Sequence, residues 1–226
     1  RKKYITLFGG EPLLTSNTYK KSIEYIFSKT VENNLQLAIV TNGYNIVNYS
    51  NILKYYHSNI REIQVTLDGT EKTHNIRRKL KSGKGSFSKI IDGINFCLDN
   101  NIPVNLRIVI DKENIDNLVE LSMFAEFQNW TSNPLFKTQL GRNYELHSCY
   151  YKSDLLFNRL QFHINIYNII KKHPHFLEFH KPDFSISKYL FENNQLPSPL
   201  FDSCPACENE WAFDYTGRIY SCTATV

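Results

Sequence analysis

The residues near the start of the chain that are best suited to chemistry are Gly9, Gly10 and Glu11, followed by Pro12. They come directly after a short run rich in strand-forming residues, 4–8, so they are expected in a loop at the carboxyl end of a strand. Two glycines allow unusual backbone angles and let a ligand approach the main chain closely. The Glu11 carboxylate would repel a phosphate and attract an ammonium group. The four residues alone fit a tight turn with a solvated glutamate equally well.

Polar groups also accompany the later strand-like runs. Thr41 and Asn42 follow the second run, Thr66 ends the third with Arg78 beyond it, and Arg107 lies in the fourth. Taken singly, each fits a turn, a cap or a solvated side chain. Taken together, the hydroxyl and amide groups suit a ribose and the guanidinium groups suit a carboxylate. The sequence therefore predicts a ligand that carries an amine, a carboxylate and a ribose.

Strand-like and helix-like segments alternate along the first part of the chain. The expected strands lie near 4–8, 35–40, 62–67, 103–110 and 135–140. The expected helices lie near 17–32, 50–56, 86–99, 114–127 and 153–172. A spacing of about 30 to 40 residues is that of a βα unit, and successive units build a parallel sheet. We therefore predict an α/β fold, a partial (β/α) TIM-type barrel of parallel strands, whose site lies at the carboxyl ends of the strands.

The cysteines point to metal chemistry near the end of the chain. Cys204 and Cys207 precede an aromatic strand-like run, and a turn near 216–217 would bring Cys222 back towards them. Three thiolates could hold an iron–sulfur centre or a structural zinc. Cys97 lies on an apolar helical face and is expected in the core. The predicted organisation is a barrel part over 1–150, a helical linker over 151–200 and a small Cys-rich β-hairpin domain from 201 to 226.

Composition narrows the class of protein. The 226 residues are 42% hydrophobic, which suffices for one sizeable core. The net charge of +4 arises from 26 basic and 22 acidic residues, a balance that argues against a nucleic-acid partner. No apolar run approaches the length of a membrane span, and five cysteines spread over the chain argue against a disulfide framework. We therefore expect a cytoplasmic protein without a membrane partner.

Read together, these motifs resemble the core of radical S-adenosylmethionine (SAM) enzymes. The resemblance is carried by segments that cover nearly the whole chain, namely Gly9-Gly10-Glu11-Pro12, Thr41-Asn42-Gly43, Val65-Thr66-Leu67-Asp68-Gly69 with His74 and Arg78, and Gly83-Lys84-Gly85-Ser86-Phe87. It is strongest to the branch with a C-terminal iron–sulfur SPASM domain, which includes the anaerobic sulfatase maturases. Cys207, Gly217 and Cys222 match the start of that domain, and Cys204 fits in place of Cys207.

The resemblance implies the cofactors and the chemistry. The cofactors would be S-adenosylmethionine and [4Fe–4S] clusters, with Gly9, Gly10 and Glu11 at the methionine amino group. Thr66 would contact the nucleoside, and Arg78 the carboxylate. A 5′-deoxyadenosyl radical would take a hydrogen atom from the substrate, with a flavodoxin or ferredoxin as electron donor. The general base is not placed by any motif, and Asp68 is expected to be a turn residue.

One part of the family pattern is missing from the chain. The Cys-x3-Cys-x2-Cys motif that holds the catalytic cluster is not in the sequence, which starts without Met and stops four residues after Cys222. We therefore expect a fragment of a longer enzyme that is inactive by itself. Three functions remain open: a maturase acting on a peptide or protein, a radical enzyme acting on a small molecule, and a non-catalytic zinc- or peptide-binding relative.

Overall fold

The computed structural model describes residues 3–143, 153–182, 193–195 and 210–221. The chain divides into two compact units, Arg1–Lys181 and Pro182–Val226. The predicted boundary at 150 therefore falls inside the first unit, because the helical segment after it packs with the sheet. Within the described residues, no helix combines the length and apolar content that a bilayer span needs.

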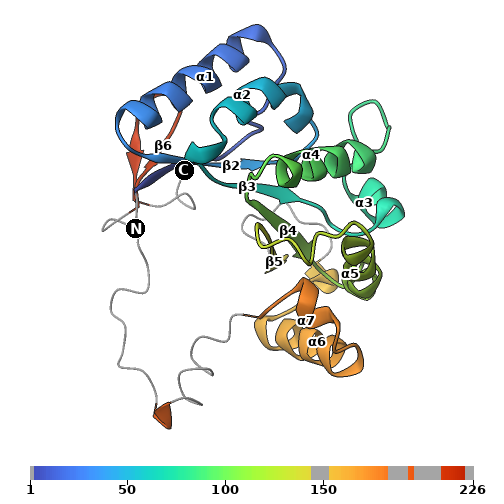
Figure 1. Cartoon of the computed structure of the whole chain (residues 1–226). Helices are drawn as coiled ribbons and strands as arrows, with labels where there is room; N and C mark the ends of the chain where they lie inside the picture. The colour runs from blue at the N-terminus through green and yellow to red at the C-terminus, as the bar shows by residue number, and fades with distance from the viewer. Residues whose placement is uncertain (1–2, 144–152, 183–192, 196–209, 222–226) are drawn as a thin grey trace. The chain divides into compact units, whose positions relative to one another are not determined.

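The first unit is built on five parallel strands in sequential order (Figure 1). The strands are β1 (Tyr4–Leu7), β2 (Gln36–Thr41), β3 (Ile60–Thr66), β4 (Val104–Ile110) and β5 (Phe136–Arg142). Every neighbouring pair is parallel, so each connection is a crossover that carries a helix. This confirms the predicted α/β fold with a partial barrel-type sheet, and each strand lies within about two residues of its expected position.

Helices connect the strands and run along one side of the sheet (Figure 1). The connecting helices are α1 (Asn17–Glu32), α2 (Ser50–Tyr55), α3 (Glu71–Arg77), α4 (Phe87–Asp99) and α5 (Leu118–Phe127), and α6 (Arg159–Lys172) and α7 (Phe176–Phe179) follow the last strand. Short 3-10 turns precede or follow several of them, at Ile46–Tyr49, His57–Asn59, Ile115–Asn117 and Ser153–Leu155. The sequence did not indicate α3 or α7, because each buries only one or two side chains and shows no apolar stripe.

Side chains alternate between two faces of the sheet, which we call the apolar face and the polar face. The apolar face packs under the helices and is built from side chains such as Ile39, Ile63, Val65, Leu106 and Ile108, all fully buried. The polar face carries Glu62, Gln64 and Thr66 from β3, Asn105 and Arg107 from β4, and Lys137 and Gln139 from β5. Because successive residues of a strand point to opposite sides, the two sets interleave along each strand.

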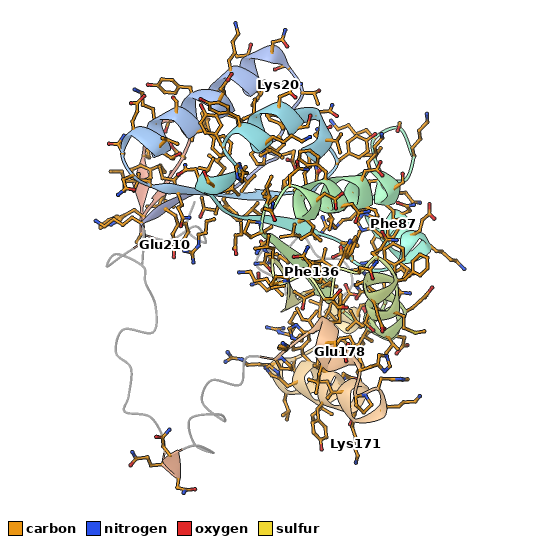
Figure 2. The ribbon with its side chains drawn as sticks, viewed as in Figure 1. Lys20, Phe87, Phe136, Lys171, Glu178 and Glu210 are labelled. Carbon is orange, nitrogen blue, oxygen red and sulfur yellow. The ribbon has the colours of Figure 1, made fainter. Side chains whose placement is uncertain are left out.

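A row of aromatic rings ties the later helices to β5. Phe87 contacts Phe124 with ring centres 5.4 Å apart, and Trp130 lies next at 5.8 Å. Phe136 follows at 5.6 Å from Trp130, and Phe179 of α7 at 6.4 Å from Phe136. Figure 2 labels Phe87 and Phe136 within this row. Such pairs add roughly 0.5–1.5 kcal/mol each beyond their area burial, so they help to fix α4, α5 and α7 around the sheet edge.

Three helices end in the same way, at an asparagine with positive φ. Asn34, Asn101 and Asn129 follow α1, α4 and α5 with φ of 53°, 57° and 58°. In each case the next residue donates its N–H to a carbonyl five residues earlier, Leu35 to Thr30, Ile102 to Cys97 and Trp130 to Ala125. This bonding satisfies carbonyls at the helix end and turns the chain towards the next strand.

The described part of the second unit is a small hairpin. Strands β6 (Ala212–Phe213) and β7 (Ile219–Tyr220) pair antiparallel, as the sequence predicted. The Asp214 carboxylate closes the turn by accepting from the backbone N–H groups of Thr216 and Arg218 and from the Tyr220 hydroxyl. Hydrogen bonding, first of all from the Thr216 hydroxyl, lowers the pKa of Asp214 to about 2. The hairpin therefore has a turn held by side-chain contacts of its own.

Candidate cofactor-binding site

The loop after β1 has the backbone shape that its glycines suggested. Gly9 and Gly10 both adopt positive φ, at 86° and 55°, which other residues reach only with strain. A Cβ atom at either position would meet nothing within 4 Å. The glycines are therefore required by the backbone conformation, and the space beside them is open.

Glu11 joins this loop to the end of β2. Its Oε1 accepts from the Thr41 hydroxyl at 2.6 Å and from the Leu13 N–H at 3.0 Å. Its Oε2 accepts from the Asn42 N–H at 2.7 Å. Hydrogen bonds to a carboxylate are about twice as strong as those between neutral groups, so these contacts fix the loop. A carboxylate offers about four acceptor sites, which leaves capacity for a ligand donor beside the glycine carbonyls.

Thr41 and Asn42 support Glu11 from β2. Thr41 is 3% exposed, and its hydroxyl both donates to Glu11 and accepts from the Gly43 N–H at 3.1 Å. We expected this hydroxyl at a ribose, whereas in the structure it is used inside the protein. Asn42 is exposed, and its Oδ1 accepts from the Tyr44 N–H, which leaves its amide nitrogen accessible.

Gly43 fixes the path of the chain after β2. Its φ is 83°, and a Cβ there would stand 2.6 Å from Val65 and 3.2 Å from Ile90. No side chain fits between β3 and α4 at this point, so the turn that follows Thr41 and Asn42 depends on glycine both for its angle and for its space.

A set of ion pairs lies where β3 and β4 end. Asp68 is 3% exposed and accepts from Arg78 Nε at 2.6 Å and from the Val109 N–H at 3.0 Å. The expectation that Asp68 is a plain turn residue is therefore wrong, because its buried carboxylate links β3, β4 and the segment after α3. Arg78 has a side chain 40% exposed, and it bonds Asp68 through Nε alone. Its two terminal nitrogens remain for a second anion.

Arg77 belongs to the same set of ion pairs, although no sequence motif indicated it. Its terminal nitrogens donate to both carboxylate oxygens of Asp111, at 3.0 and 2.8 Å, and one of them also donates to Glu113 at 3.3 Å. Burial alone would raise the pKa of Asp111, but the Arg77 pair and the Asn143 amide outweigh it, and the pKa is lowered. Arg77 at the end of α3 thus bonds mainly Asp111, with a longer contact of 3.9 Å to Asp68, whereas Arg78 just after the helix bonds Asp68.

His74 is a structural residue of the region where β3 and β4 end, which we call the rim. It is fully buried, its Nδ1 accepts from the Asp68 N–H at 3.2 Å, and its Nε2 lies 3.0 Å from the Ser86 hydroxyl. Because Nδ1 accepts, the proton of the neutral ring is on Nε2 and is donated to Ser86. Burial lowers the pKa of His74 to about 4, so the ring is neutral at pH 7. His74 therefore has a structural role through its contacts with Asp68 and Ser86.

Thr66 and Arg107 lie next to each other on the polar face, paired in register across β3 and β4. Thr66 is partly buried, and its hydroxyl has no partner within the described residues, so it can serve a ligand. Arg107 is partly buried, and within the described residues it forms no ion pair. The structure therefore places Thr66 and Arg107 side by side, and Thr66 lies two residues before Asp68, which follows the end of β3.

A family comparison identifies the fold. The model of the radical SAM superfamily matches residues 1–125, more than half of the chain. The chain belongs to the radical SAM superfamily. S-adenosylmethionine and a [4Fe–4S] cluster are the cofactors of this family of enzymes, in agreement with the cofactors that the sequence motifs implied.

Relatives of this radical SAM chain fall into more than one functional class. A serine-type anaerobic sulfatase-maturating enzyme of Bacteroides thetaiotaomicron is 30% identical over 116 residues, which are 49% of this chain and 27% of that protein. A GTP 3′,8-cyclase of Staphylococcus epidermidis is 28% identical over 127 residues, 56% of this chain and 35% of that protein. The chain therefore spans well under half the length of these relatives.

Likeness in structure extends over almost the whole radical SAM chain. A solved structure described as native anSMEcpe with bound AdoMet and Kp18Cys peptide superposes with a TM-score of 0.68 at 17% identity. The match covers 99% of this chain and 61% of that one. At this identity the likeness establishes the fold.

The predicted metal ligands Cys204, Cys207 and Cys222 lie outside the described residues. Within the described residues, no three His, Cys, Asp or Glu side chains gather as a metal site would require. Cys97 is buried in the core, as expected, and burial raises the pKa of its thiol to about 12. The cluster ligands therefore stay predictions from the sequence.

Proposed function

We propose that the whole protein is a radical SAM enzyme that modifies a peptide or protein. The observation that carries this proposal is the loop of Gly9, Gly10 and Glu11, which Glu11 fixes to the end of β2 and which has open space where its glycines lack a Cβ atom. Two comparisons support a peptide or protein as the substrate: the anSMEcpe structure of the same fold holds a peptide, and a sulfatase-maturating enzyme is 30% identical over 116 residues.

In this proposal, residues at the ends of different strands bind different polar groups of the cofactor. Gly9 and Gly10 would receive the methionine ammonium on their carbonyls, with Glu11 beside them as the opposite charge. Asn42 and Thr66 would bond the ribose hydroxyls, while Thr41 would keep Glu11 in place. Arg78 would hold the carboxylate with the terminal nitrogens that Asp68 leaves unused. The residues present thus suit each polar group of S-adenosylmethionine.

When bound and reduced at the cluster, the cofactor supplies the radical that abstracts hydrogen. The chain's own part is to orient the cofactor over the polar face and to exclude water. The electron would come from a flavodoxin or ferredoxin, and the catalytic cluster would be held by cysteines that this sequence does not include.

The cofactor assignment is tested by binding. In the full-length protein, reconstituted anaerobically with iron and sulfide, Glu11→Gln should raise the Kd for S-adenosylmethionine about tenfold or more, because charge-assisted hydrogen bonds are lost. Glu24→Gln is the matched control, since Glu24 is an exposed glutamate of α1. Unchanged affinity in Glu11→Gln would refute the assignment of this loop.

A small-molecule substrate is the second candidate, favoured by the identity to the GTP 3′,8-cyclase. Deuterium transfer separates the two. Deuterated cell extract would be split into peptide and small-molecule fractions, and the 5′-deoxyadenosine formed with each would be analysed by mass spectrometry. Deuterium gained from the peptide fraction alone supports the maturase, whereas deuterium gained only from small molecules replaces it with the second candidate.

The auxiliary cluster has its own test. Cys222→Ala should lower the iron bound per full-length protein after anaerobic reconstitution, because a thiolate ligand is removed. Cys97→Ala is the control, since Cys97 is buried in the core. Tightly bound zinc with iron unchanged in Cys222→Ala would show a structural zinc site instead.

A further inference from the structure

Among the described residues, the charged side chains on and beside the polar face are paired with the exception of Arg107. Glu62 forms an ion pair with Lys137, and Arg78 pairs with Asp68. Arg107 lies between these pairs on β4, and no carboxylate of the described residues reaches it. A partly buried guanidinium without an anion is costly, and such a charge is normally paired.

Two unpaired atoms mark the same area. Arg107 Nε is buried without a hydrogen-bond partner, and so is the Oδ1 of Asn105, a residue only 6% exposed. Asn105 precedes Arg107 by two positions and therefore lies on the same face. Buried polar atoms are normally hydrogen-bonded, and a ligand that carries both an anion and an N–H group would satisfy this donor and this acceptor.

The neighbouring strand has a glycine, and therefore no side chain, next to Arg107. Gly141 of β5 lies beside Val109, and a Cβ atom there would stand 3.9 Å from Arg107 Nε. A side chain larger than glycine would therefore begin to fill the space next to the guanidinium. Gln139 flanks the same space, and its Oε1 accepts from Gln64 Nε2 at 2.7 Å, which adds amide groups to the wall.

The cofactor does not account for this site. S-adenosylmethionine has one carboxylate, on the same carbon as its ammonium group, and the two terminal nitrogens of Arg78 already offer that carboxylate a cationic partner. Arg78 lies beyond the end of β3, and its two terminal nitrogens are not used by Asp68. Arg107 lies within β4, where it pairs in register with Thr66. The second arginine is left for another anion.

We propose that Arg107, Asn105, Gln64 and Gln139 form a subsite for an acidic peptide, with a substrate carboxylate on Arg107 and a peptide N–H on Asn105. This rests on the proposed function and names its substrate class. Amide groups and a single cation match the backbone and one acidic side chain of an extended peptide.

The test uses two fluorescent ten-residue peptides of Gly and Ser that differ in one central residue, Glu or Gln. Binding to the full-length reconstituted protein is measured by anisotropy, with and without S-adenosylmethionine. The Glu peptide should bind about tenfold tighter, and Arg107→Gln should abolish this preference. Lys137→Gln should keep it, because Lys137 is an exposed cation that is already paired. Arg107→Lys should restore part of it.

Two outcomes would overturn the subsite. Equal binding of both peptides to the wild-type protein is one. The other is a tenfold loss of S-adenosylmethionine affinity in Arg107→Gln, which would assign Arg107 to the cofactor carboxylate, as the sequence first suggested. If wild-type protein binds no S-adenosylmethionine while the peptide preference is present, the proposed function fails and the acidic-peptide site stands.

Discussion

The two faces of β3, β4 and β5 are stabilised by different interactions. The apolar face is filled with Ile, Val and Leu side chains that are fully buried under the helices. The polar face is held by a few ion pairs and amide contacts and keeps buried atoms without partners. Close packing of apolar side chains stabilises the first face. The second face has polar atoms without hydrogen-bond partners, which a ligand could use.

The largest effect should come from the rim, where the polar face is also structural. Asp111→Ala leaves Arg77 with the more exposed Glu113 and a longer contact of 3.9 Å to Asp68, so we expect a loss of about 3–5 kcal/mol in the free energy of unfolding. Urea denaturation at pH 7 measures it. A loss below about 1 kcal/mol would mean that the rim pairs do not hold the fold.

Adjacent residues of β4 compare the faces directly. Leu106→Ala opens a cavity under the helices and should cost about 2–5 kcal/mol. Arg107→Gln, one residue on, removes an unpaired charge and should change the stability by less than about 1 kcal/mol. Similar losses in both variants, again by urea denaturation, would remove the distinction between the faces.

Acid should weaken the packing behind the rim and beside β5. Burial lowers the pKa of both His74 and His180 to about 4, below the value of about 6.5 expected in the unfolded chain. Their contribution is complete above pH 6.5 and is lost as the pH falls towards 4, because the unfolded chain takes up the protons first. We expect a loss of about 2–3 kcal/mol per histidine over this range. In His74→Gln the pH dependence of unfolding should shrink by about half, and an unchanged slope would contradict the assignment.

The smallest effect is expected from the amide pair of the polar face. Gln139→Ala removes the hydrogen bond with Gln64 at an exposed position and should cost no more than about 1 kcal/mol. The thermal unfolding midpoints of Gln139→Ala and Thr138→Ala are compared, and the larger decrease is expected in Thr138→Ala. The Thr138 hydroxyl lies on the opposite face and donates to the Phe179 carbonyl of α7. A larger loss in Gln139→Ala would make the polar face a stabilising element.

Patterns local in the sequence could be predicted, and pairings between distant residues could not. The strand with Ile39 was predicted from its run of β-branched and apolar residues, and the helix expected near 17–32 is α1, which the Ser16 side chain caps. Helix α3 was missed because only His74 of its residues is buried. The sequence does not show that Arg77 bonds Asp111 and that Arg78 bonds Asp68. The two arginines are adjacent, and a step of one residue along a helix rotates the side chain by about a quarter turn, so each meets a different part of the fold.

The three asparagines that end α1, α4 and α5 have a further consequence. Each holds a conformation that strains any residue with a Cβ, although asparagine tolerates it better than most. Replacing Asn34, Asn101 or Asn129 with glycine would relieve that strain, for a net gain of a few tenths to about 1 kcal/mol each. The fold therefore carries a reserve of stability away from its site, and it could offset the cost of later changes to the polar face.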